Sequence, residues 1–119
     1  MPTDFAIRWA EALSGRVVEV VCFASYAITI NFDDKSLLQI EGGYELLGAD
    51  GSVEFVTALP TRDSSLHRLA GSSVASARID QTAPLIEIRF VDGAVLVLRR
   101  TSIAYESFRV IKGLEEQVF

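Results

Sequence analysis

Apolar residues recur along this chain in two local patterns, and the order of the patterns is repeated. Residues 5–13 carry apolar side chains at every fourth position, which is helical spacing, whereas residues 28–32 alternate apolar and polar side chains as a half-buried strand does. The same order, a helical segment that ends at a glycine and then an alternating segment, returns at residues 63–71 and 86–90. The pattern predicts two copies of one helix-plus-strand unit.

The two copies can be aligned residue by residue. Leu13, Gly15 and Val18 return 56 positions later as Leu69, Gly71 and Val74. The strand residues Ile28, Ile30, Phe32, Asp34, Leu38 and Ile40 return 58 positions later as Ile86, Ile88, Phe90, Asp92, Leu96 and Leu98. A two-residue insertion between the two blocks explains the change of offset.

Each copy is predicted to contain a hairpin between its second and third strands. The turns fall at residues 33–36 and at Asp92-Gly93, and an Asp-Gly pair is typical of a type I′ turn. The third strands differ, because residues 36–41 keep polar side chains on one face while residues 94–98 are apolar on both. The second of these strands is therefore expected to be covered on both faces or to form an interface.

A further hairpin closes each copy, over residues 44–56 and 105–119. The linker between the copies is too short to separate independent domains, and neither half is long enough to bury much surface alone. We therefore expect a single domain, residues 1–119, with an α+β and mostly β fold. It is built from two tandem helix-plus-β-meander repeats, about 13–57 and 69–119, related by an approximate two-fold axis and forming one small barrel or sandwich.

Composition adds a hint about assembly. Half of the 119 residues are hydrophobic and the mean hydropathy is +0.31, so some apolar surface is expected to be buried against another subunit, in a homodimer. The net charge of −5 argues against nucleic acid as a partner. The charge is uneven, because residues 1–60 hold nine acids and three bases and residues 61–119 hold seven acids and eight bases.

No apolar run approaches the roughly 20 residues that cross a bilayer, and the first residues do not resemble a signal peptide. The expected location is the cytoplasm, with no membrane partner. The lone Cys22 cannot form an internal disulfide, which agrees with a reducing compartment. Its apolar neighbours favour a small buried side chain.

Residues that carry catalytic or metal chemistry are sparse. His67 is the one histidine, and neither a second histidine nor a neighbouring cysteine completes a nucleophilic or zinc site. Asp34, Asp50 and Asp92 stand in predicted turns, where turn chemistry explains them better than calcium binding does. Gly42-Gly43 is interpreted as a pair of turn glycines. The sequence therefore indicates no catalytic residue, no metal and no cofactor.

The best candidates for binding are the repeated Tyr-Glu pairs and the residues near them. The candidate residues are Tyr44, Glu45, Arg99, Arg100, Tyr105, Glu106 and Phe108. An exposed carboxylate beside an aromatic side chain can meet a ligand or partner. The alternative is structural, with the tyrosine buried and Glu106 in a salt bridge with Arg99 or Arg100.

The arginines allow a second interpretation. Arg99-Arg100, together with Arg78, Arg89 or Arg109, can line a small anionic-ligand pocket. The alternative is that these are solvated charges at strand ends and sheet edges, where they discourage edge-to-edge pairing.

The doubled motifs resemble a family of small, mostly actinobacterial proteins of unknown function. The matching segments are Leu13-x-Gly15-x-x-Val18, Phe32-x-Asp34, Leu69-x-Gly71-x-x-Val74, Phe90-x-Asp92-Gly93 and Tyr105-Glu106-Ser107-Phe108. The last of these is similar to the Tyr-Glu-Ala-Trp segment that closes the family. Lys35 stands where the family has a glycine, and Phe108 where it has tryptophan. The resemblance implies the fold but no activity.

Three function classes follow. The leading hypothesis is a non-enzymatic cytoplasmic protein-interaction module that self-associates, of which an immunity or inhibitor-like role is one version. The alternative is a small-ligand-binding module with a pocket between the repeats. The third class is an enzyme that uses Glu106 or Glu45 as a general base.

Overall fold

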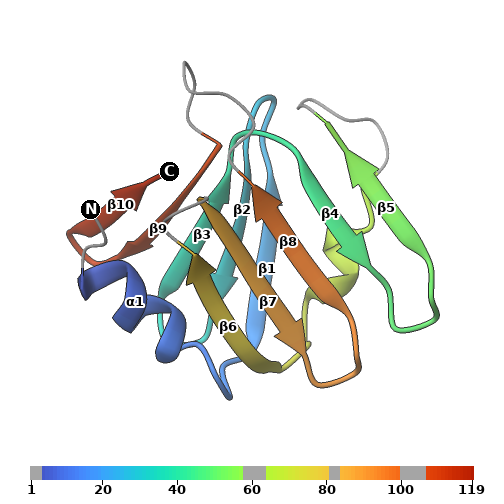
Figure 1. Ribbon diagram of the computed structural model, residues 1–119, viewed down its shortest axis with the longest axis horizontal. Coiled ribbons are helices and arrows are strands. Elements are labelled where there is room, and N and C mark those ends of the chain that lie inside the picture. The colour runs from blue at the N-terminus through green and yellow to red at the C-terminus, as the bar shows by residue number, and fades with distance from the viewer. Residues whose placement is uncertain (1–3, 58–63, 81–83, 100–106) are drawn as a thin grey trace.

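Most apolar residues of the chain lie on strands. The computed structural model describes residues 4–57, 64–80, 84–99 and 107–119. Across these ranges the fold is α+β and mostly β, as the periodicity predicts, with one α-helix and one 3₁₀-helix (Figure 1). The elements are α1 (Asp4–Glu11), β1 (Val18–Phe23), β2 (Ile28–Phe32), β3 (Ser36–Ile40), β4 (Tyr44–Leu47), β5 (Val53–Val56), η1 (Leu66–Leu69), β6 (Val74–Asp80), β7 (Leu85–Phe90), β8 (Val95–Arg99), β9 (Phe108–Lys112) and β10 (Glu115–Val118).

The described strands form two antiparallel sheets that exchange their hairpins. The first sheet has the order β1-β2-β3-β9-β10 and the second β5-β4-β8-β7-β6. Each sheet thus combines three consecutive strands from one half of the chain with the last hairpin of the other half, through the pairs β3–β9 and β4–β8. The sequence predicts the hairpins but not their exchange. The two sheets are not closed into a barrel.

The crossing from one sheet to the other occurs at Gly42-Gly43, between β3 and β4. The sequence interpretation of this pair as ordinary turn glycines is incomplete, because the chain here passes close to other backbone. A Cβ atom on Gly43 would collide with the carbonyl oxygen of Val56, and one on Gly42 would lie 3.4 Å from the Cα of Ser107. Glycine is required at Gly43 because the crossing leaves no room for a side chain.

The inner faces of the two sheets share one hydrophobic core. The alternating residues of β2 and β7 point inward as predicted, with Ile30 and Ile88 fully buried. The core cluster consists of Ala6, Trp9, Ala10, Leu13, Val18, Ile28, Ile30, Phe32, Leu38, Ile40, Tyr44, Leu46, Leu66, Leu69, Val74, Ile86, Ile88, Phe90, Ala94, Leu96, Leu98, Phe108 and Val110. Because it draws side chains from both halves, neither half has a complete core alone.

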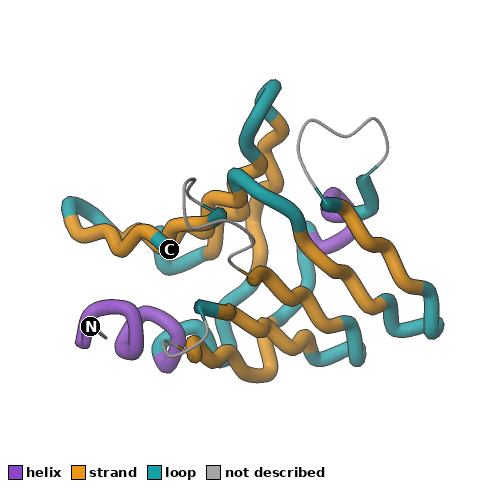
Figure 2. Tube along the Cα trace, turned by 45° about the horizontal axis from the view of Figure 1, so that its top comes forward, coloured by secondary structure: helices purple, strands orange, loops and turns teal. Residues whose placement is uncertain are grey.

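The two helices cover the ends of this core. Figure 2 shows the N-terminal helix lying alongside the hairpin that ends at the C-terminus. Trp9 of α1 anchors it there, because its indole N–H donates to the carbonyl oxygen of Ile111 at 3.1 Å and its ring meets Phe32 edge-on. The second predicted helix, over residues 63–70, is confirmed only as the short 3₁₀-helix η1, and residue 63 lies outside the described residues.

The two Leu-x-Gly-x-x-Val segments bind each other reciprocally where the sheets meet. Gly15 and Gly71 each end a helical segment with positive φ, at 82° and 87°, which glycine adopts without a steric penalty. Val17 and Ser73 form an antiparallel bridge between the segments. Four backbone hydrogen bonds accompany it: Gly15 N–H to Val74 O at 2.9 Å, Gly71 N–H to Val18 O at 2.7 Å, Val18 N–H to Ser72 O at 2.9 Å and Val74 N–H to Arg16 O at 2.8 Å.

The turn at Asp92-Gly93 differs from the type I′ turn that the sequence predicts. Gly93 has φ of 99°, but Asp92 does not have positive φ, so only one central residue is left-handed. The N–H of Gly93 donates to the carbonyl oxygen of Phe90 at 3.0 Å, which is the pattern of a three-residue loop with glycine at its left-handed position. Lys35 occupies the corresponding position of the first hairpin, with φ of 69°.

Lys35→Gly is expected to stabilise the protein by about 1 kcal/mol, because a side chain at a left-handed position costs about that much. The melting temperature should rise by about 4 °C. Gly93→Ala is the matched control and should lower stability at the corresponding position of the other hairpin. Equal stabilities of Lys35→Gly and wild type, measured by urea denaturation, would show that the first turn is not strained.

Candidate functional site

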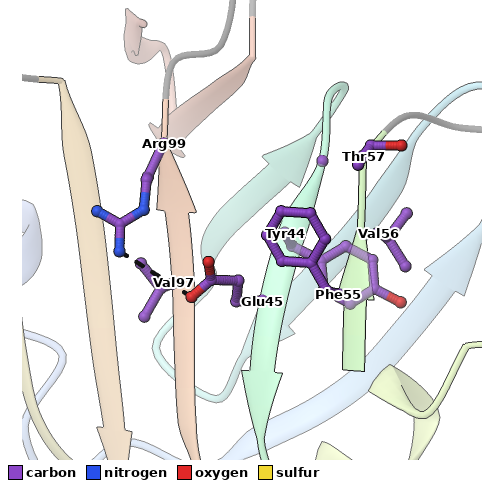
Figure 3. Close-up of a pocket in the computed structure, with 8 residues that line it drawn as sticks. Tyr44, Glu45, Phe55, Val56, Thr57, Val97 and Arg99 are labelled. Carbon is purple, nitrogen blue, oxygen red and sulfur yellow. Dashed lines mark ion pairs between the residues drawn. The ribbon is translucent and has the colours of Figure 1, made fainter. Parts of the chain in front are cut away.

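A surface hollow of about 280 Å³ brings together three of the residues that the sequence marks as binding candidates (Figure 3). Tyr44, Glu45 and Arg99 all line it, from β4 and β8. It lies on the outer face of the second sheet, and it includes residues of both halves of the chain because β4 and β8 are neighbours. The full lining is Gly43, Tyr44, Glu45, Phe55, Val56, Thr57, Val97 and Arg99.

The remaining candidates are not at this hollow. Tyr105, Glu106 and Arg100 lie outside the described residues, as does the expected salt bridge of Glu106. Phe108 is fully buried and stacks on Phe119, with ring centroids 4.7 Å apart and planes inclined by 14°. Phe108 therefore cannot meet a ligand or partner at the surface, and its role in the described structure is to fill the core.

Glu45 and Arg99 form the polar part of the hollow. Figure 3 shows their side chains pointing toward one another across Val97, with Glu45 Oε2 and Arg99 Nη2 4.0 Å apart. The side chains are 29% and 57% exposed, so water screens the pair and its contribution to stability is below about 1 kcal/mol. Val97 beneath them is almost completely buried, as are Leu96 and Leu98, which confirms that this strand is covered on both faces.

The arginines that the structure describes do not converge on an anionic-ligand pocket, and Arg100 lies outside the described residues. Arg78 and Arg89 both bind the buried carboxylate of Glu87, at 2.7 Å and 2.6 Å. Arg109 lies in the first sheet, where it pairs with Glu41 at 3.1 Å. Arg78 and Arg89 share one carboxylate, and Arg109 lies in the other sheet from Arg99. These contacts favour the alternative interpretation, in which the arginines are charges at strand ends and sheet edges.

A partly buried polar network ties β5 to the segment that follows it. The hydroxyl of Tyr44 donates to Glu54 Oε2 at 2.7 Å and lies 2.6 Å from Ser64 Oγ. The backbone N–H of Ser65 donates to both carboxylate oxygens of Glu54, each at 3.0 Å. Burial alone would raise the pKa of Glu54, but the hydrogen bonds from Tyr44 and Ser65 outweigh it and hold that pKa below its usual value. Burial, together with the Glu54 carboxylate, raises the pKa of Tyr44.

This network turns Glu54 toward the body of the protein and leaves the apolar residues of β5 outside. Val53 and Phe55 are 67% and 64% exposed, and the exposed part of Leu47 lies beside them on β4. Phe55 also lines the hollow. The apolar surface formed by Leu47, Val53 and Phe55 is called the β5 patch below.

Other candidate residues have structural roles. The carboxylates of Asp34, Asp50 and Asp92 each accept a backbone N–H two residues later, at 3.0, 3.0 and 2.9 Å, which confirms the turn interpretation. In the part of the chain that the structure describes, no group of three or more His, Cys, Asp or Glu side chains is placed to hold a metal ion. His67 is exposed, with Nδ1 2.9 Å from the carbonyl oxygen of Ser64.

Cys22 corrects a further expectation. It is exposed rather than buried, because it lies on an edge strand and faces away from the core, opposite Thr29.

Among the described residues no helix is long and apolar enough to span a membrane.

No protein-family model, no curated protein and no solved structure matches this chain. The resemblance to the actinobacterial family stays a prediction, and the outer face of the second sheet is the basis for the function proposed below.

Glu54→Gln is expected to destabilise the protein by about 2 kcal/mol at pH 7, because hydrogen bonds to a charged acceptor are lost. The ionised form of Glu54 is favoured in the folded state, so its contribution is present above the usual pKa of 4.5 and is lost as the pH falls through the lowered folded-state pKa. The difference in unfolding free energy between wild type and variant should therefore shrink below about pH 4.5.

Glu45→Gln is the matched control for this prediction, since its carboxylate is on the same strand pair but makes only the loose contact with Arg99. It should change stability by less than about 0.5 kcal/mol. If urea denaturation gave equal losses for the two variants, the Glu54 network would not be the source of stability at this edge.

Proposed function

We propose that this protein is a non-enzymatic, cytoplasmic protein-interaction module that self-associates through the outer face of its second sheet. The observation that carries the proposal is the β5 patch, where Val53 and Phe55 expose about two thirds of their surface side by side. Contiguous apolar surface of this kind is a usual mark of an interaction site, and its burial is favourable by about 25 cal/mol per Å².

The chemistry of the same face favours binding over catalysis. Glu45 is the carboxylate in the hollow, and it lies in contact with solvent beside a guanidinium group. A general base has to lie within hydrogen-bond reach of the substrate proton, and burial or neighbouring charges usually tune its pKa toward the working pH. The hollow offers an apolar wall of Phe55, Val56 and Val97 instead.

A small-ligand-binding module is the second candidate. The space between the sheets is occupied by the core cluster, so the supporting observation is the hollow on the outer face, which draws residues from both halves of the chain. Its volume of about 280 Å³ lies just below the range of roughly 300–1,000 Å³ that is usual for ligand pockets. Self-association ranks first because the β5 patch extends beyond the hollow.

The proposal includes the arrangement of the two repeats. We propose that they are related by an approximate two-fold axis near Val17 and Ser73, supported by the reciprocal hydrogen bonds there and by the matching strand orders of the two sheets. Membership in the family that the sequence resembles, and an immunity or inhibitor-like role, are finer versions of the same proposal.

The mass in solution, measured by light scattering behind size exclusion over a wide range of concentration, tests self-association. The mass should approach twice 13.0 kDa as the concentration rises. A mass of 13.0 kDa at every concentration would contradict the proposed function.

A further inference from the structure

The described part of the chain leaves four strands at sheet edges. These are β1 and β10 in the first sheet and β5 and β6 in the second. An edge strand presents unpaired backbone N–H and C=O groups to one side and can pair with a strand of another molecule. Proteins usually guard such edges with bulges or outward charges, so an unguarded edge is informative.

Three of the four edges carry a guard. The pairing register of β1 shifts between Val18 and Val20, and that of β6 shifts between Val74 and Ser76. Such irregularities twist an edge and interrupt its ladder. The third edge, β10, contains the exposed acids Glu115 and Glu116.

The β5 edge has neither device. Its ladder with β4 runs without a shift from Val53 to Val56. Its one charged residue, Glu54, is turned inward and satisfied by Tyr44 and Ser65. The side chains that remain outside are those of Val53 and Phe55, which have high strand propensity and no charge.

We infer that β5 pairs antiparallel with β5 of a second copy of this chain, so that the second sheets of the two molecules form one continuous sheet. The inference rests on the proposed self-association and identifies the surface that carries it. The arrangement is an isologous two-fold dimer, in which the same strand from each copy forms the contact.

The alternation of side chains restricts the register. Directly opposed residues in an antiparallel pair lie on the same face of the sheet, so residues on the outer face of one β5 must oppose residues on the outer face of the other β5. Centring the pair on Phe55 opposes the two Phe55 rings and places Glu54 against Val56 of the other copy. Centring it one residue earlier would oppose Glu54 to Glu54, which repels. The favoured register is therefore centred on Phe55.

Charge also favours a second copy at this edge. An isologous contact places each surface against itself, so a surface with net charge repels its own copy. Around β5 the negative charges are partly offset, because Glu45 lies beside Arg99 and the inward-turned Glu54 is stabilised by the positive charge of Arg68 as well as by its hydrogen bonds. The β10 edge, by contrast, would bring together the exposed Glu115 of each copy, next to Glu116, which pairs with Arg109 at 3.4 Å.

The size of the contact predicts a dimer of modest affinity. The exposed parts of Phe55, Val53 and Leu47 offer on the order of 300 Å² per copy, whereas a standard interface buries about 800 Å² per partner. Backbone hydrogen bonds along the edge add to this. The dimer should therefore dissociate on dilution rather than persist as a permanent assembly.

Phe55→Lys tests the assignment, with Phe23→Lys as the matched control, because Phe23 is an aromatic residue 50% exposed on the edge strand β1. Sedimentation over a concentration series should show the dimer dissociation constant raised about tenfold or more by Phe55→Lys and unchanged by Phe23→Lys. Circular dichroism would verify that both variants are folded.

Cross-linking tests the register by a second route, because a disulfide traps a dimer covalently even where loss of the Phe55 ring weakens the contact. In a Cys22→Ser background, Phe55→Cys should form a disulfide-linked dimer under mild oxidation, because opposed Cα atoms in such a ladder are about 5.5 Å apart. Ser76→Cys, exposed on the guarded β6 edge, is the control and should remain monomeric.

The outcomes separate the two claims. Suppose that the wild type dimerises. A Phe55→Lys variant that dimerises equally well, or a Ser76→Cys variant that cross-links as readily as Phe55→Cys, would then overturn the β5 pairing while the proposed self-association stands. A wild type that is monomeric at every concentration would overturn both.

Discussion

The reciprocal pairing of the two Leu-x-Gly-x-x-Val segments is the constraint on which the rest of the structure depends. Each segment ends a helix, turns at a glycine with positive φ and then hydrogen-bonds to the other segment up to the first residue of its own first strand. The pairing therefore sets where β1 and β6 start and how the two sheets face each other. It also explains why the motif occurs twice, since each copy supplies the partner of the other.

The hairpin exchange follows from the same arrangement. Once the meanders β1–β3 and β6–β8 face each other across the core, the hairpin after each meander can add to the edge of the opposite sheet. The Gly42-Gly43 crossing makes this possible on one side, because it allows the chain to pass close to Val56. The exchange carries β5 to the rim of the second sheet, and this position leaves Val53 and Phe55 exposed.

Much of this fold could be predicted from local periodicity. The alternation in β2 and β7, the helical spacing around Trp9 and the two-sided apolar strand β8 all lie where the pattern indicates. The exchange of hairpins could not be predicted, because strand pairing between distant segments leaves no trace in a period of two. The prediction that Cys22 is buried was wrong for a related reason, since an apolar run on an edge strand has the same sequence pattern as an apolar run on a buried strand.

The candidate site was predicted only in part. Tyr44, Glu45 and Arg99 do meet at one hollow, although the repeat alone gave no reason for β4 and β8 to be neighbours. Phe55 was missed because alternation in β5 would place its apolar side chains on the core face. The buried hydroxyl of Tyr44 reverses this, since it satisfies Glu54 on the inner side. A polar partner on the neighbouring strand of the same hairpin therefore outweighs the alternation within β5.

The most direct test of the account is hydrogen exchange at the backbone amides of Val18 and Val74, which donate across the reciprocal pairing. If the pairing holds the two halves as one cooperative unit, both amides exchange only through global unfolding. Their protection free energies then equal each other and the unfolding free energy from denaturant. Exchange of one amide at a clearly lower free energy than the other would mean that the halves open separately, and would contradict the account.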